Sequence, residues 1–420
     1  MSLTVCQQDV LNKTLNGKNV LISGSAGTGK SFLTRHIIHQ LKLQKGPNNV
    51  GVVSPTGIAA ANINGTTIHA WGGIGIGDGD ATALIKKARG NRLAFTRWKT
   101  ARVLIIDEVS MLDGELFNKL EKIAQSIRSN SRPFGGIQLI LVGDFYQLPP
   151  VTVTDAGFCF ESDAWNAANI EKCELTEVIR QQNDTEFISI LNSIRIGQCA
   201  TETENALAKC HVSVKPPPSD GIVPTKLYCI NRDVDRENEL FLERLPGERV
   251  LFKAIDVFNA STPAGAETKL VDMLNKKTHQ VLPLKIGAQV MITKNMADFS
   301  LVNGSRGIVT DFAEKGAPIV RFANGVVMQM ERAETEQKFM NSKCTRSQYP
   351  LKLAWAITIH KSQGATLERV EVQVSGAFAA GQTYVAVSRC TKLDGLWISG
   401  DMITKRHIFT DPKVVNFYCV

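Results

Sequence analysis

The chain has 420 residues, of which 43% are hydrophobic and 21% charged, a composition typical of a soluble globular protein with two or three domains. It contains no apolar run near the roughly 20 residues that span a bilayer, and its start resembles neither a signal peptide nor a transit peptide. Nine cysteines without a CxxC pair predict free thiols in a reducing, intracellular compartment and no zinc site. The net charge of +8 indicates a polyanionic partner such as nucleic acid, although many basic proteins have none.

The first predicted element is a helix over Leu3–Leu15 that leads into the first strand. It carries Gln7, whose side-chain amide could read the edge of an adenine base at a nucleotide site just downstream. The alternative is an ordinary surface glutamine, which is what Gln7 taken alone would indicate.

A phosphate-binding loop is predicted next, between a buried strand over Asn19–Ser23 and a helix that begins near Phe32. Glycines let backbone N–H groups turn toward an anion, and the helix N-terminus adds partial positive charge. Lys30 would reach the β- and γ-phosphates, and the Ser31 hydroxyl would bind Mg²⁺. The alternative, a glycine turn before an ordinary helix, is weakened by the strand–loop–helix order, so we predict ATP binding. The loop comprises Gly24, Ser25, Ala26, Gly27, Thr28, Gly29, Lys30 and Ser31.

A second buried strand over Val50–Ser54 runs into a turn and helix that begin at Pro55 and Thr56. His69 follows, in a stretch whose hydroxyls at strand ends suit contacts to a phosphate backbone. The alternative for His69 is a partly buried histidine with its hydrogen bonds satisfied. The glycine-rich, basic segment over residues 71–98 is predicted to be either a small inserted subdomain or a long loop.

Two acidic residues end the third predicted strand, Arg102–Glu108. Asp107 would hold Mg²⁺ through water, and Glu108 would orient or deprotonate the attacking water. Paired acids at a strand end are often helix caps, but a phosphate loop upstream favours the catalytic interpretation.

The fourth strand, Ile137–Val142, follows an amphipathic helix over Leu116–Ile127 and ends in a loop with two prolines. Gln147 in this loop could sense the γ-phosphate, because it lies just past the carboxyl end of a strand. Phe145 and Tyr146 could stack on a base, the alternative being that both are core residues.

Alternating strands and helices predict a doubly wound, mostly parallel sheet whose ligands lie at the carboxyl ends of the strands. A second α/β unit is predicted to begin near Thr225–Cys229. From Leu284 the pattern becomes that of short strands, and Asn324-Gly325 is a strong hairpin signal, which predicts a small inserted β-barrel. The α/β pattern then resumes, and a helix over Thr383–Arg389 carries one arginine. This arginine is a candidate arginine finger, the alternative being a surface salt bridge.

With these residues in view, the sequence resembles the petite-integration-frequency (PIF) family of DNA helicases, in the 5′-to-3′ branch of superfamily 1 that is related to the RecD helicases. The resemblance covers essentially the whole chain. The segments that carry it are Gly24–Ser31, Ser54–Gly73, Asp107–Leu112, Leu116–Pro150, Arg180-Gln181, Ile359–Gly364, Gln382–Arg389 and Asp411–Tyr418.

The resemblance implies two RecA-like P-loop NTPase domains with ATP between them, over residues 1–178 and over residues 179–294 with 350–420. It implies a small wedge near residues 71–98 and an SH3-like β-barrel over residues 295–349. The implied function is an ATP- and Mg²⁺-dependent DNA helicase, monomeric when free, that binds single-stranded and forked DNA. Replication, recombination, repair or telomere maintenance are its implied settings, in a nucleus, a mitochondrion or a viral replication site.

The same resemblance assigns roles to individual residues. Gln7 reads adenine, and Lys30 and Ser31 hold the phosphates and Mg²⁺. Asp107 and Glu108 serve hydrolysis. The implied γ-phosphate sensors are Gln147, Arg180 and Arg389. The implied contacts to single-stranded DNA are Thr56, His69, Phe145, His360 and Ser362.

Three other functions stay open at this point. One is a translocase on RNA or DNA without robust unwinding, because discrimination of the 2′-hydroxyl depends on pocket detail. Another is a RecD-type motor subunit that serves a nuclease. The third, a degenerate nucleic-acid binder, is disfavoured because Lys30, Asp107, Glu108, Gln147 and Arg389 are all present.

Overall fold

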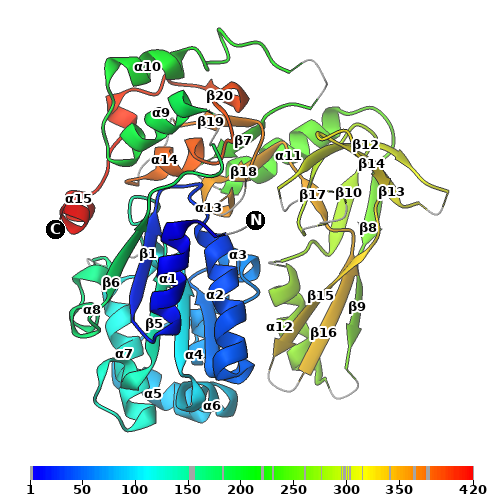
Figure 1. Ribbon diagram of the computed structural model, residues 1–420. Helices are drawn as coiled ribbons and strands as arrows, with labels where there is room; N and C mark the ends of the chain where they lie inside the picture. The colour runs from blue at the N-terminus through cyan, green and yellow to red at the C-terminus, as the bar shows by residue number, and fades with distance from the viewer. Residues whose placement is uncertain are drawn as a thin grey trace. The chain divides into compact units, whose positions relative to one another are not determined.

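The computed structural model divides the chain into two compact units (Figure 1). Unit 1 comprises Met1–Asn205, Ala377–Ser388 and Ile403–Val420, and unit 2 comprises Ala206–Gly376 and Arg389–Met402. The structure describes residues 3–150, 157–181, 184–218, 222–228, 231–259, 262–275, 277–294, 296, 299, 301, 304–314, 316–339, 342–362, 366–374 and 379–419. Among these residues, no helix combines the length and apolar composition needed to cross a membrane.

A six-stranded, fully parallel sheet forms the centre of unit 1, with strand order β3-β2-β4-β5-β1-β6. This confirms the predicted doubly wound sheet for the first half of the chain. Its strands are β1 (Val20–Gly24), β2 (Val50–Ser54), β3 (Thr66–Thr67), β4 (Val103–Asp107), β5 (Gln138–Val142) and β6 (Glu171–Leu175).

Helices cover both faces of this sheet, with α1 and α2 together on one of them (Figure 1). In β4, Val103 and Ile105 join the core under α1 and α2, whereas Leu104 and Ile106 join the core on the opposite face. Because successive side chains alternate between two covered faces, the strand is apolar from Val103 to Ile106. The helices of unit 1 are α1 (Val5–Leu15), α2 (Lys30–Lys45), α3 (Gly57–Asn62), α4 (Ile68–Gly72), α5 (Ala81–Gly90), α6 (Arg92–Thr100), α7 (Gly114–Arg128), α8 (Asp163–Ala167), α9 (Thr185–Arg195), α14 (Gln382–Val387) and α15 (Pro412–Cys419). A further helix, α10 (Thr201–Ala208), contains the boundary to unit 2.

The segment expected to be either a subdomain or a loop contains two helices, α5 and α6. Asp80 caps the first and Asn91 the second, since each accepts a hydrogen bond from the backbone N–H three residues on. Trp98 of α6 lies edge-on to Trp71 at a centroid distance of 4.6 Å and donates its indole N–H to Gly72 O. These contacts show that the segment is helical and packed on the core of unit 1, whereas its status as a separate subdomain stays a prediction.

Unit 2 contains a second parallel sheet, with strand order β18-β7-β19-β20, and three antiparallel sheets. The largest of these has the order β14-β13-β12-β11-β17 and includes the hairpin predicted at Asn324-Gly325. Its closure into an SH3-like barrel stays a prediction, as do the sequence-based domain limits. The parallel strands are β7 (Thr225–Tyr228), β18 (Ala356–Thr358), β19 (Val370–Gln373) and β20 (Leu396–Ser399). The strands of the largest antiparallel sheet are β11 (Gln289–Ile292), β12 (Arg306–Phe312), β13 (Pro318–Phe322), β14 (Val327–Gln329) and β17 (Leu351–Leu353).

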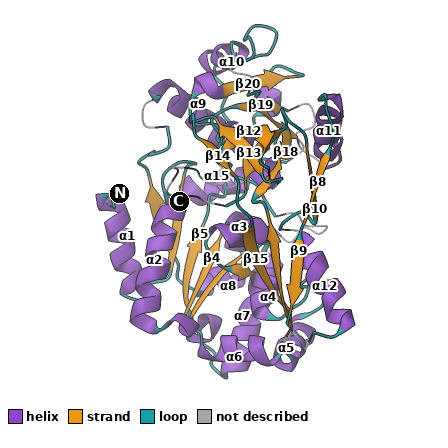
Figure 2. Cartoon of the chain, turned by 90° about the vertical axis from the view of Figure 1, so that its right-hand side faces the viewer, coloured by secondary structure: helices purple, strands orange, loops and turns teal. Residues whose placement is uncertain are grey.

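The two smaller sheets of unit 2 come partly from residues for which the sequence predicts no element. Helix α12 packs against the three-stranded sheet through Leu270, Leu274 and Cys344 (Figure 2). The remaining elements are α11 (Asn231–Arg244), β8 (Val250–Lys253), β9 (Ile255–Phe258), α12 (Ala264–Asn275), β10 (Val281–Leu284), β15 (Ala333–Phe339), β16 (Ser342–Gln348) and α13 (Ile359–Ser362).

Candidate nucleotide-binding site

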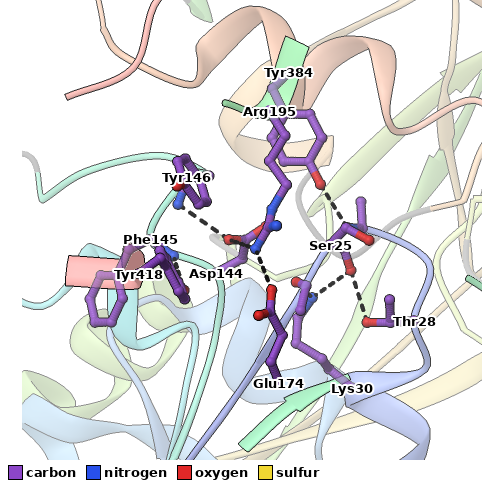
Figure 3. Close-up of polar contacts among 12 residues, drawn as sticks. Ser25, Thr28, Lys30, Asp144, Phe145, Tyr146, Glu174, Arg195, Tyr384 and Tyr418 are labelled. Atoms are coloured by element: carbon purple, nitrogen blue, oxygen red, sulfur yellow. Dashed lines mark hydrogen bonds and ion pairs between the residues drawn. The ribbon is translucent and has the colours of Figure 1, made fainter. Parts of the chain in front are cut away.

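The glycine-rich loop lies between β1 and α2, at the carboxyl edge of the unit 1 sheet. Lys30 Nζ donates to Gly24 O at 2.7 Å and to Ser25 O at 3.0 Å, and the Thr28 hydroxyl also donates to Ser25 O (Figure 3). Burial lowers the pKa of Lys30, an effect that the carboxylates of Asp144 and Glu108 oppose. The ammonium is therefore a half-buried donor held by loop carbonyls, which phosphate oxygens could replace.

Gly27 fits this loop for two reasons. Its φ of +90° lies in the left-handed region that glycine adopts without strain. A Cβ at this position would lie 2.5 Å from Gln181 Oε1 and 2.9 Å from Arg180 Cβ. The Gly27 carbonyl accepts hydrogen bonds from the Ile179 and Arg180 N–H groups at 2.9 and 3.1 Å. The segment around Arg180 is thus attached directly to the phosphate loop.

Gln7 is buried and connects α1 to the same loop. Its Oε1 accepts from the Thr4 N–H in a capping box, and its Nε2 donates to Thr28 O at 3.4 Å. The alternative of an ordinary surface glutamine is therefore wrong. The adenine contact stays a prediction, for which the amide keeps its second N–H donor and the second lone pair of its oxygen.

Tyr384 of α14 reaches the phosphate loop, a contact that the sequence did not indicate. The Ala26 N–H donates to the Tyr384 hydroxyl at 2.7 Å (Figure 3). Near the C-terminus of the same helix, the Ser388 carbonyl accepts from Arg180 Nη1 at 3.1 Å. A backbone N–H of the kind that cradles phosphate is thus already paired with a tyrosine hydroxyl.

Asp107 and Glu108 lie at the carboxyl end of β4, as predicted. Burial, and secondarily the charge of Glu108, raises the pKa of Asp107 to about 8. Glu108 has a left-handed φ of 55°, an unusual conformation for a residue other than glycine that is often found at functional sites. A buried carboxyl group of this kind fits a divalent cation, whose charge would offset the cost of ionisation. Ser31, at the first turn of α2, is exposed and offers a hydroxyl ligand.

The loop after β5 carries Gln147, which is buried and whose N–H donates to Asp144 O at 2.9 Å. Gly381 packs against this loop so closely that a Cβ there would lie 2.3 Å from Tyr146 O. Gln147 is thus in a positioned loop, and its role as a γ-phosphate sensor stays a prediction.

Phe145 is in the core, which is a correction to the base-stacking role expected for it. Its ring contacts Phe158, Phe160, Trp165 and Phe417 at centroid distances of 4.9 to 6.2 Å. Tyr146 is buried as well. The structure therefore supports the alternative that both aromatic residues are core residues.

The other expected DNA contacts differ in their exposure. The Thr56 hydroxyl accepts a hydrogen bond from the Ala59 N–H at 3.3 Å. His69 is partly buried, and this burial lowers its pKa, an effect that the charge of Asp113 opposes. In unit 2, the buried Ser362 hydroxyl donates to Ile359 O at 2.7 Å, so it is not available to DNA in this structure. The side chain of His360 lies outside the described residues.

Arg389 is buried in unit 2 and donates to Ser362 O at 3.5 Å. The alternative of a surface salt bridge is therefore wrong, because this guanidinium is not at the surface. Its role as an arginine finger stays a prediction. Within the described part of the chain, no cluster of three or more His, Cys, Asp or Glu side chains is arranged to hold a metal ion.

Comparison with known proteins now identifies the family. A family model described as PIF1-like helicase matches residues 2–205, and one described as DNA helicase Pif1, 2B domain, matches residues 273–312. The crystal structure of Pif1 helicase from Candida albicans is 40% identical in sequence and superposes with a TM-score of 0.80, over 100% of this chain and 99% of that one. This chain belongs to the PIF1-like helicase family.

Two further members of the PIF1-like family indicate how far the similarity extends. The ATP-dependent DNA helicase PIF1 of Danio rerio is 42% identical over 98% of this chain and 61% of its own length. The crystal structure of Pif1 helicase from Bacteroides in complex with ADP-AlF3 and single-stranded DNA is 29% identical, with a TM-score of 0.68 over 100% of this chain and 97% of that one. The chain thus spans about three fifths of the length of the curated relatives that it matches.

Proposed function

We propose that this chain is the motor of an ATP-dependent DNA helicase that moves 5′ to 3′ along single-stranded DNA and separates duplexes at forks. The observation that carries the proposal is the phosphate loop, in which the half-buried Lys30 ammonium is held by loop carbonyls and the charges of Asp144 and Glu108 oppose the lowering of its pKa by burial. The structure of a relative from Bacteroides contains both ADP-AlF3 and single-stranded DNA. It therefore supports both the proposed nucleotide and the proposed nucleic-acid substrate.

The residues of unit 1 supply most of the chemistry of this proposal. Glu108 accepts the proton of the attacking water, and Lys30 binds the β- and γ-phosphates. Asp107 and Ser31 hold Mg²⁺, which when bound neutralises charge on the phosphates. Gln147 and Arg180 sense the γ-phosphate from loops that are attached to the phosphate loop or to its neighbouring strands.

Arg389 is a further candidate γ-phosphate contact in this proposal, as the resemblance implies, and several polar side chains are candidate contacts to the nucleic acid. Thr56 and His69 are the candidates in unit 1, because both lie beyond the carboxyl ends of strands and keep part of their surface exposed. His360, in helix α13, which directly follows β18, is the candidate in unit 2. Phe145 and Ser362 are left out because they are buried.

The test is the rate of ATP hydrolysis by the purified chain with and without single-stranded DNA or RNA, followed by unwinding of tailed duplexes. We expect stimulation by DNA and strand separation only for duplexes with a 5′ tail. Lys30→Ala should abolish turnover and keep single-stranded DNA binding, because the lysine faces the phosphates.

Other results would point to the other functions. DNA-stimulated hydrolysis without unwinding would favour a translocase or a RecD-type motor subunit, and stronger stimulation by RNA would favour an RNA track. Unwinding of 3′-tailed duplexes alone would contradict the proposed polarity. Full turnover by Lys30→Ala would contradict the assignment of the phosphate loop.

A further inference from the structure

An ion pair joins the loop that carries Gln147 to helix α9. Arg195 Nε donates to Asp144 Oδ2 at 3.1 Å and Nη2 donates to Asp144 Oδ1 at 3.0 Å, a bidentate arrangement (Figure 3). The Asp144 side chain is fully buried, and that of Arg195 is 11% exposed. Glu174, at the end of β6, lies 3.5 Å from the same Nη2 and is half exposed. Asp144 is therefore a buried carboxylate with a dedicated cationic partner.

Aromatic rings hold the guanidinium in place. Its central carbon lies 4.6 Å from the centroid of the Tyr146 ring and 5.6 Å from that of Tyr418. These two rings stack on each other at 4.9 Å, and the Tyr418 hydroxyl accepts from the Phe145 N–H at 3.3 Å. Three consecutive residues of the loop, from Asp144 to Tyr146, thus have contacts to Arg195 or to α15.

Gln147 follows directly in the chain. Its N–H donates to Asp144 O, and the Tyr146 N–H donates to Asp144 Oδ1 at 3.3 Å. The carboxylate that Arg195 orients is therefore part of the turn that determines where Gln147 leaves the loop. A shift of that carboxylate would move the Gln147 backbone with it.

The same pair controls charge near the phosphate loop. The charges of both Asp144 and Arg195 act on the Lys30 ammonium, with opposite signs. Loss of Arg195 alone would leave a buried, uncompensated carboxylate near the place where phosphate would bind. It would both attract Lys30 and repel a γ-phosphate.

We propose that Arg195 is a positioning residue for ATP hydrolysis, which orients and neutralises Asp144 so that Gln147 and Lys30 meet the γ-phosphate. This inference rests on the proposed ATPase function. Arg195 acts through Asp144, and the aromatic rings of Tyr146 and Tyr418 fix the orientation of the Arg195 guanidinium.

The first test compares Arg195→Gln and Arg195→Lys with the wild type in DNA-stimulated hydrolysis. Misplaced catalytic groups cost about 100-fold in rate, so we expect Arg195→Gln to lower kcat by about that factor. KM for ATP should rise, because the unpaired Asp144 carboxylate repels the γ-phosphate, whereas single-stranded DNA affinity should stay within about twofold of wild type. Arg195→Lys keeps the positive charge but cannot form the bidentate pair with Asp144. Its kcat should therefore lie between those of the wild type and Arg195→Gln. A kcat of Arg195→Gln within twofold of wild type would overturn the proposal.

The second test separates positioning from stability. Asp144→Asn/Arg195→Gln removes both charges, so it should recover most of the Tm that Arg195→Gln loses, because no buried charge is left unpaired. The kcat of the double variant should stay low, because no ion pair holds the loop that carries Gln147. Recovery of kcat together with Tm would show a structural role only and would overturn the proposal.

Arg128→Lys is the matched control. Arg128 is a partly buried arginine of unit 1 that donates to the carbonyls of Gly135, Trp98 and Ala101. Its replacement should lower Tm without lowering kcat at a temperature where the protein is folded. If the wild type itself does not hydrolyse ATP, both the proposed function and this inference fail. If the wild type is active and the Arg195 variants match it, only this inference fails.

Discussion

Ionisable groups that are buried or half-buried interact around the phosphate loop, and they affect one another's pKa. Lys30 influences the pKa of Asp107, and Glu108 influences both. In such an environment the loss of one charge changes the cost of holding the others, so variants here act on function through electrostatics as well as contacts.

Glu108→Gln should bind ATP and hydrolyse it about 10²–10⁴ times more slowly than the wild type, because an amide cannot accept the proton of water. Single-turnover hydrolysis and binding of a fluorescent nucleotide measure the two effects. Glu115→Gln is the control, since Glu115 is an exposed acid on α7 whose partner is Lys119. A rate for Glu108→Gln within severalfold of wild type would contradict its role as the base.

Asp107 should make the stability of the metal-free protein depend on pH. Burial raises its pKa to about 8, so the folded state keeps a proton that the unfolded state has already released. The resulting stabilisation is complete below the ordinary carboxyl pKa and is lost as the pH rises toward about 8.

The measurement is the difference in Tm between the wild type and Asp107→Asn across this pH range in metal-free buffer. The Tm of the wild type should decrease relative to that of Asp107→Asn as the pH rises, and added Mg²⁺ should make this decrease smaller. Titrating groups that do not interact with Asp107 are common to both proteins and cancel. A difference that stays constant with pH would mean that Asp107 titrates near its ordinary value.

At the scale of whole elements, α15 joins the end of the chain to the first half of the sequence. Phe417 stacks on Phe160 at 4.3 Å and lies 5.3 Å from Phe145, and Lys172 Nζ lies 4.2 Å from its ring centroid. Tyr418, the next residue, contacts the loop of Gln147 as described above. The helix therefore packs against the loop that carries Gln147 as well as against the aromatic core.

Phe417→Ala should lower the free energy of unfolding of unit 1 by about 2 kcal/mol, less than for a fully buried ring because Phe417 is only partly buried. Denaturant unfolding measures the change. Asn416→Ala, one residue earlier on the exposed side of α15, is the control and should change stability by less than about 0.5 kcal/mol. Equal effects of the two changes would mean that the aromatic cluster does not stabilise the helix.

At the scale of the whole molecule, the two units carry different machinery. Unit 1 contains the phosphate loop, whereas unit 2 contains the antiparallel sheets. The strand-rich segment over residues 295–349 begins and ends at neighbouring points of unit 2, as expected of an insertion. The Thr293 N–H, just before it, donates to Pro350 O, just after it, at 2.9 Å. Arg306 is buried and donates to Val223 O, so it belongs to the core and not to a DNA-binding surface.

Phe299 in this segment is 44% exposed, and we predict that it contacts single-stranded DNA. Phe299→Ala should weaken DNA binding by about 1–3 kcal/mol, the range for a lost base–aromatic stack, and leave basal ATP hydrolysis unchanged. Fluorescence anisotropy with a labelled oligonucleotide measures the affinity. Val327→Ala, an exposed apolar residue of β14, is the control. Unchanged affinity in Phe299→Ala would remove this residue from the DNA surface.

Local patterns in the sequence determine much of the fold. The phosphate loop, the apolar strands of unit 1 and the hairpin at Asn324-Gly325 were all predictable, because glycine positions and alternation act over a few residues. The region of β8, β9 and β10 was not. In β9 the apolar side chain of Ile255 is 55% exposed, while Asp256 points to a buried partner, Arg346. The usual alternation is inverted there, because a long-range ion pair replaces apolar burial.

Some residues of the candidate site could likewise be predicted from local sequence, and others could not. By itself, the sequence determined the loop that would bind phosphate and the acids Asp107 and Glu108, since each lies at a strand end that the local pattern defines. Only the tertiary structure decided that Phe145 is core, that Tyr384 pairs with Ala26 and that Arg195 holds Asp144. These contacts join residues far apart in the chain, and a side chain's role there depends on which distant partner shields or neutralises it.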